Sequence, residues 1–138
     1  AVVRTLACAS YLLFPWVAYT GDGAVDTGLA IANTTKDPPA IGTPSQKGDV
    51  TLYFWRSTGT NNPAPLKIAT ALEGGQTTTY VLSALGAPFS GYVIAVCGFQ
   101  MGHGIAAFLS SGSFNAFTAL SLANPRLPGG LVQEITGH

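Results

Sequence analysis

Charged side chains are scarce in this chain. Of its 138 residues only 6 are Lys or Arg and 6 are Asp or Glu, so 9% are charged against a usual ~25%. The net charge is zero, which leaves no basic footprint for nucleic acid and no polybasic strip for anionic lipid. Hydrophobic residues make up 47% and the mean hydropathy is +0.34. These values predict a protein whose apolar surface packs against another surface, and they exclude a nucleic-acid partner.

Long apolar runs are also lacking. The longest stretch without charge lies between Glu73 and Arg126, but glycines and Pro88 interrupt it. No window of about 20 residues reads as a continuous apolar helix, so we expect no membrane span. The segment Ala1–Val2–Val3 lacks the charged start of a signal peptide, as a mature secreted chain would.

Only two cysteines are present, Cys8 and Cys97. They are too far apart in the sequence for a CxxC pair or a metal cluster. Two outcomes are open: two buried thiols, or one disulfide closing almost the whole domain. We expect the disulfide, and with it a secreted, extracellular or cell-surface location.

Residues for catalysis are equally few. The two histidines are His103, between glycines, and His138 at the end, and no serine stands in a G-x-S-x-G pattern. No glycine-rich loop suits a phosphate. We therefore expect no enzyme, no metal and no cofactor. The pattern Asn33–Thr34–Thr35 is a glycosylation acceptor, which matters only if the chain meets glycosylating machinery.

Short apolar segments separated by turn-rich stretches predict a single all-β, immunoglobulin-like sandwich of seven to nine strands. The expected strands are 2–9, 11–19, 28–34, 50–57, 66–72, 77–83, 91–99, 105–110 and 131–135. Apolar residues alternate in several of them. Strand 91–99 is apolar on both faces, which calls for a second cover by a sheet, a loop or another subunit. Segment 113–122 fits a short helix, and a strand nearly as well.

The C-terminal end differs from the body. We expect residues 1–123 to form the sandwich and residues 124–138 to form a Pro/Gly-rich extension with a short terminal strand. That strand is the candidate for donation to a neighbouring subunit; the alternative is an ordinary edge strand. It consists of Leu131, Val132, Gln133, Glu134 and Ile135.

Several segments resemble a family of uncharacterised secreted bacterial proteins with immunoglobulin-like sandwich domains. The resemblance covers roughly positions 8 to 110 and is carried by segments 12–17, 26–34, 50–54 and 89–100, with His103–Gly104. It implies an extracellular sandwich and supplies no catalytic residue. Members carry a cysteine where this chain has Asp49–Val50, so the resemblance implies Cys8 as the partner of Cys97. The design is also similar to that of filament subunits that exchange strands.

These features predict a structural subunit that assembles with itself, head to tail, into an extracellular filament. The alternative is a monomeric adhesive or carbohydrate-binding module that takes a glycan on aromatic residues such as Tyr53 and Trp55, which share one strand face. The predicted disulfide lies within one subunit if segment 2–9 folds onto its own domain, and between subunits if that segment is donated. We favour the first, because strand 11–19 follows Cys8 without a linker.

Overall fold

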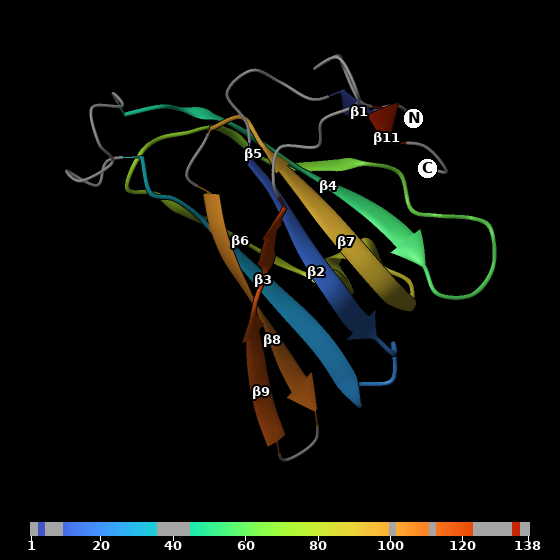
Figure 1. The fold of residues 1–138 in the computed structure, drawn as a ribbon. Coiled ribbons are helices and arrows are strands. Elements are labelled where there is room, and N and C mark those ends of the chain that lie inside the picture. The colour runs from blue at the N-terminus through green and yellow to red at the C-terminus, as the bar shows by residue number, and fades with distance from the viewer. Residues whose placement is uncertain are drawn as a thin grey trace.

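Two antiparallel sheets form the body of the molecule in a computed structural model that describes residues 3–4, 10–35, 45–99, 102–110, 113–122 and 134–135 (Figure 1). The five-stranded sheet has the order β10-β2-β7-β4-β5 and the four-stranded sheet the order β6-β3-β8-β9. A separate pair joins β1 to β11. The strands are β1 (Val3–Arg4), β2 (Ser10–Tyr19), β3 (Val25–Asn33), β4 (Gly48–Arg56), β5 (Leu66–Leu72), β6 (Thr77–Val81), β7 (Phe89–Cys97), β8 (Gly102–Ser110), β9 (Ser113–Thr118), β10 (Leu120–Leu122) and β11 (Glu134–Ile135).

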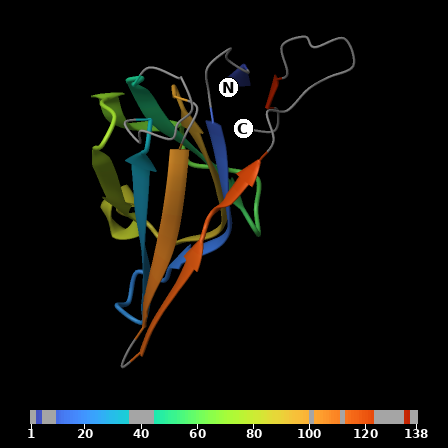
Figure 2. The same cartoon turned by 60° about the vertical axis from the view of Figure 1, so that its left-hand side comes forward.

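Two of the places where the chain changes sheets match each other. The chain passes from β2 to β3 and from β7 to β8, while β2 pairs with β7 in one sheet and β3 pairs with β8 in the other. Figure 2 shows the two layers from the side. Among the described residues there is no α-helix, only one 3-10 turn at Leu82–Leu85. The expectation of an all-β sandwich is confirmed.

The core lies between the two layers. Alternate residues of each central strand point into it, as the sequence pattern predicts for 91–99: Val93, Ala95 and Cys97 are fully buried. Large aromatic side chains fill the centre, and the rings of Phe54 and Phe89 meet edge to face at 5.6 Å. Burial of these side chains is the main stabilisation of the sandwich.

A bulge bends β2 where it passes Gly91. The register of β2 against β7 shifts between Phe14 and Val17, so Pro15 and Trp16 lie in the irregular stretch. Proline is tolerated there because a bulge needs no ladder donor. A Cβ at Gly91 would lie 1.9 Å from the carbonyl oxygen of Trp55, so only glycine fits this crossing.

Segment 113–122, for which the sequence left a short helix and a strand open, is extended in the structure. It forms two strands, β9 beside β8 and β10 beside β2. The chain switches sheets at buried Ala119, whose N–H donates to the carbonyl of Gly104. The ring of Phe117 stacks on Phe108 with centroids 5.4 Å apart. Pairing with the free edge of β8 outweighs the near-helical spacing of its aromatic residues.

Candidate functional site

The outer surface of the four-stranded sheet is exposed and nearly free of charge. No residue between Glu73 and Arg126 carries a formal charge, so β6, β8 and β9 contribute none. Four large apolar side chains of this surface are 44% to 65% exposed. The register gives its outward residues, called here the apolar outer face: Thr77, Thr79, Val81, Asp26, Gly28, Ala30, Ala32, His103, Ile105, Ala107, Leu109, Phe114, Ala116 and Thr118.

This face is corrugated rather than flat. Strand β3 presents small residues, Gly28, Ala30 and Ala32, while the adjacent β8 presents Ile105 and Leu109. A shallow hollow of about 290 Å³ lies along the boundary between these two rows. Its lining is mostly methyl and methylene groups, so it suits an apolar side chain better than a polar ligand. His103 lies on β8, where its exposed side chain lines this hollow.

The outer surface of the five-stranded sheet carries aromatic residues. Tyr53 and Trp55 share one face of β4, as the alternation predicts, and Trp55 lies opposite Tyr92 of β7. The rings of Trp55 and Tyr92 stack with centroids 5.1 Å apart and planes 11° apart. The rings of Trp55 and Tyr92 therefore cover one face of each other. Burial raises the pKa of the Tyr53 hydroxyl.

The two ends of the chain meet. Strand β1 pairs antiparallel with β11, with Val3 opposite Ile135 and Arg4 opposite Glu134. This short ladder belongs to neither sheet of the sandwich (Figures 1 and 2). Of the candidate donated strand, Glu134 and Ile135 thus lie in a strand, while Leu131, Val132 and Gln133 fall outside the described residues.

The described part of the chain contains no disulfide, so the predicted one is wrong for this structure. Cys97 is a free thiol and is fully buried. On its neighbouring strands Ser10 and Val50 lie opposite it, so the place beside its sulfur is taken by the Ser10 hydroxyl and not by a second thiol. Burial raises the pKa of Cys97 to about 12 despite a hydrogen bond with Ser10. Cys8 lies outside the described residues.

Asn33 is a structural residue rather than an exposed glycan acceptor. Its side chain is 1% exposed. Its Nδ2 donates to the carbonyls of Gln46 and Leu72, both at 2.9 Å, and its Oδ1 accepts from the hydroxyl of Thr35 at 2.7 Å. With both N–H groups of the amide engaged in the interior, a glycan on Nδ2 is incompatible with this packing.

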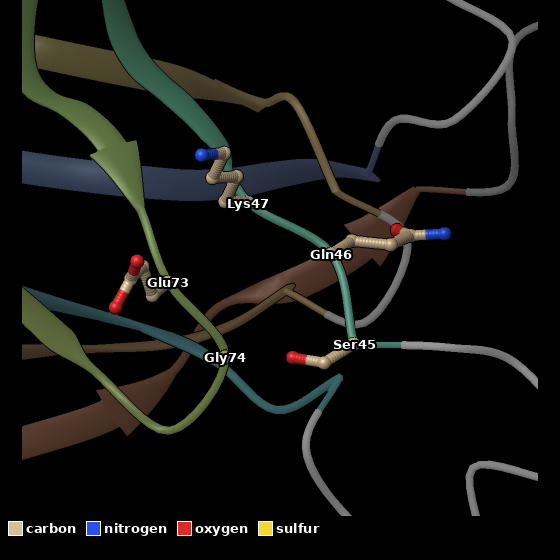
Figure 3. Close-up of a pocket in the computed structure, with 5 residues that line it drawn as sticks. All are labelled: Ser45, Gln46, Lys47, Glu73 and Gly74. Atoms are coloured by element: carbon tan, nitrogen blue, oxygen red, sulfur yellow. The ribbon is translucent and has the colours of Figure 1, made fainter.

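A polar cavity of about 400 Å³ lies next to this network (Figure 3). Its described lining comprises Ser45, Gln46, Lys47, Glu73 and Gly74. The side chains of Lys47 and Glu73 are exposed, so they keep most of their hydration. An open, solvated rim of this kind offers little of the low-dielectric setting that strengthens binding or catalysis.

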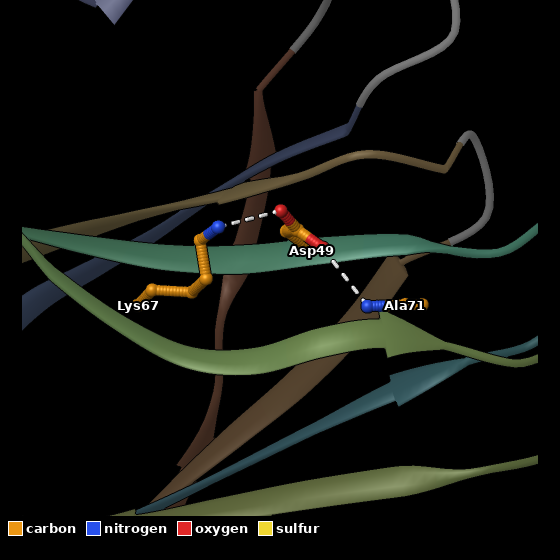
Figure 4. Close-up of polar contacts among 3 residues, drawn as sticks. All are labelled: Asp49, Lys67 and Ala71. Atoms are coloured by element: carbon orange, nitrogen blue, oxygen red, sulfur yellow. Dashed lines mark hydrogen bonds and ion pairs between the residues drawn. The ribbon is translucent and has the colours of Figure 1, made fainter.

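A second polar cluster fixes the irregular pairing of β4 and β5 (Figure 4). The carboxylate of Asp49 accepts from Lys67 Nζ and from the N–H of Ala71, each at 2.9 Å. The hydrogen bond with Lys67, then that with Ala71, lowers the pKa of Asp49. Both charged side chains are about half exposed, so the ion pair stabilises the fold by at most about 1 kcal/mol.

The part of the chain that the structure describes holds no group of three or more His, Cys, Asp or Glu placed to bind a metal ion. None of its helices is long and apolar enough to cross a membrane.

Comparison with known proteins identifies no relative. No family model, no curated protein and no solved structure matches this chain. The resemblance to secreted bacterial sandwich proteins therefore reduces to the architecture itself, a two-sheet antiparallel β-sandwich.

Proposed function

We propose that this protein is a non-enzymatic structural subunit that assembles with copies of itself, head to tail, into an extracellular filament. The subunits are joined by strand exchange between chain ends. The pairing of β1 with β11 outside both sheets supports this proposal most directly.

The β1–β11 ladder is suited to exchange because it is short and stands apart. Each strand contributes two residues, and an isolated two-stranded ladder is marginal in water. The same antiparallel register can form between β11 of one copy and β1 of the next. Because donor and acceptor are different strands, the contact is heterologous, and it repeats along a fibre when the rotation between successive copies does not close a ring.

The surface of the sandwich supports assembly as well. An apolar face that is exposed in a monomer marks an interaction site when it is extensive. The apolar outer face meets this description, with Leu109 and Phe114 51% and 65% exposed. A chain with so few charges stays soluble more easily when such surface is covered by other subunits.

The alternative, a monomeric carbohydrate-binding module, fits the aromatic residues less well. A sugar ring packs on an open aromatic face. Trp55 and Tyr92 instead stack on each other at an angle of 11°, and Tyr53 packs beside them against a buried cluster that includes Val96. This arrangement is typical of a side-chain ladder that stabilises the sheet.

Electron microscopy and light scattering of the full chain test the proposal. We expect filaments at micromolar concentration from the native chain and from the control Ile135→Thr, which keeps the backbone N–H. Ile135→Pro removes that donor and is expected to abolish them. A native chain that remains a monomer overturns the filament. Filaments of Ile135→Pro that match the native ones overturn exchange through β11.

A further inference from the structure

We infer that two copies of this chain pack against each other through the apolar outer face, with β8 of each copy lying over β3 of the other. This contact is lateral and does not use β1 or β11. It therefore goes beyond head-to-tail assembly and can form whether or not the ends exchange.

The face is complementary to itself. Within the sheet, Ile105 of β8 lies beside Ala30 of β3, and Ala107 lies beside Gly28. A two-fold axis that runs along the strands between β3 and β8 places β8 of one copy over β3 of the other at the same level. Ile105 then meets Ala30 of the second copy, and the reverse contact forms by symmetry. Large side chains thus enter the hollow beside Ala30 and Ala32.

Charge also favours a second copy as the occupant. The only formally charged residue that the described part of the chain places on this face is Asp26, at its margin beside Leu109. Asp26 is already engaged, since its carboxylate accepts from the backbone N–H of Thr27 and of Ser83. A partner rich in charge would lose hydration here without gaining ion pairs. With an equally apolar surface, such as this same face, that penalty is confined to Asp26, which the two-fold axis places under Leu109 of the other copy.

The available area is sufficient. Strands β3 and β8 have nine residues each, and β6 and β9 have five and six. With strands ~4.8 Å apart and a rise of ~3.4 Å per residue, the face covers roughly 500 Å² in projection. Two such faces together reach the ~1,000 Å² that a specific interface requires. The alanines allow the sheets to approach to the usual ~10 Å.

Sedimentation of the full chain carrying Ile135→Pro tests this contact without filament formation. We expect a species of twice the 14.2 kDa chain mass. Adding Ile105→Lys, which places an unpaired cation in the interface, should weaken association at least tenfold. Leu120→Lys is the matched control, because Leu120 is 55% and Ile105 48% exposed and Leu120 lies on the other sheet. It should leave the dimer intact.

Mixing two variants tests the geometry itself. In the same background, Ile105→Lys and Ala30→Asp should each be monomeric, and their mixture should regain dimers because the new ammonium and carboxylate meet across the axis. Circular dichroism should show both folded. A monomeric Ile135→Pro chain, or equal loss with Leu120→Lys, overturns the lateral contact. Failure of the mixture to dimerise overturns the β8-over-β3 register. Neither outcome affects filaments that depend on β11.

Discussion

The hydroxyl of Thr27 links the two sheets, and Thr27→Val tests how much that link stabilises the fold. Thr27 on β3 is fully buried. Its hydroxyl donates to the carbonyl of Ala18 on β2 at 2.7 Å and accepts from the N–H of Ala18 at 3.0 Å. Strand β10 pairs with β2 only as far as Leu13. At Ala18 the hydroxyl of Thr27 therefore makes the two hydrogen bonds that a paired strand would otherwise make.

Valine has the shape of threonine but neither donates nor accepts. The substitution leaves two buried backbone groups of Ala18 unpaired, each at a cost of about 1–3 kcal/mol, partly offset by the added methyl group. We expect Thr27→Val to lower the free energy of unfolding by about 2–4 kcal/mol. Thr27→Ser keeps both hydrogen bonds and loses one buried methyl, so about 1 kcal/mol is expected.

Urea denaturation followed by tryptophan fluorescence measures both variants. Protein at sub-micromolar concentration keeps association from adding to stability. The expected result is a lower midpoint for Thr27→Val than for Thr27→Ser at an unchanged m-value. A Thr27→Val protein as stable as Thr27→Ser would refute the argument, because it would show that Ala18 finds other partners.

Three further predictions follow from single residues. Ala71→Gly should stabilise by roughly 0.5–1 kcal/mol in urea denaturation, because Ala71 has φ +50° where an L side chain is strained. Stability in urea denaturation should fall from about pH 9 towards pH 12, with Cys97 contributing up to ~1.4 kcal/mol per pH unit, because the unfolded chain releases the Cys97 proton first. Cys97→Ala should make that slope shallower and leave the part due to buried tyrosines such as Tyr53. Asn33→Asp should lower the melting temperature by several degrees, since a carboxylate repels the two carbonyls that Asn33 now binds, and equal melting temperatures would contradict this.

Strand positions could be predicted from alternation alone. The expected strand 66–72 coincides with β5, and expected strands 11–19, 50–57 and 91–99 overlap β2, β4 and β7 within about two residues. Each of these strands has one face in the core, so period two is strong in the sequence. At 113–122 the sequence left a short helix and a strand open, because Phe114 and Phe117 also fit a helical spacing locally. Only the unpaired edge of β8, distant in sequence, selects the strand.

The apolar outer face could not be predicted in this way. The apolar outer face forms only because β3 pairs with β8, with Val25 opposite Ser110. Periodicity says which residues share a strand face but not which strands are neighbours. The sequence shows the absence of charge after Glu73. It does not show that this absence leaves one sheet surface nearly free of charge. The structural role of Asn33 was likewise invisible, because its partners Gln46 and Leu72 come from other segments.

The distribution of charge distinguishes the two sides of the sandwich. Edge strand β5 carries exposed Lys67, ion-paired with Asp49 of β4, and Pro63 and Pro65 precede it. Charge, proline and irregular register are the features by which edge strands resist pairing with other chains. Edge strand β9 has none of them: it is regular, uncharged, and exposes Phe114. Association is therefore expected on the β8–β9 side, and a charge placed on β5 should leave it unchanged.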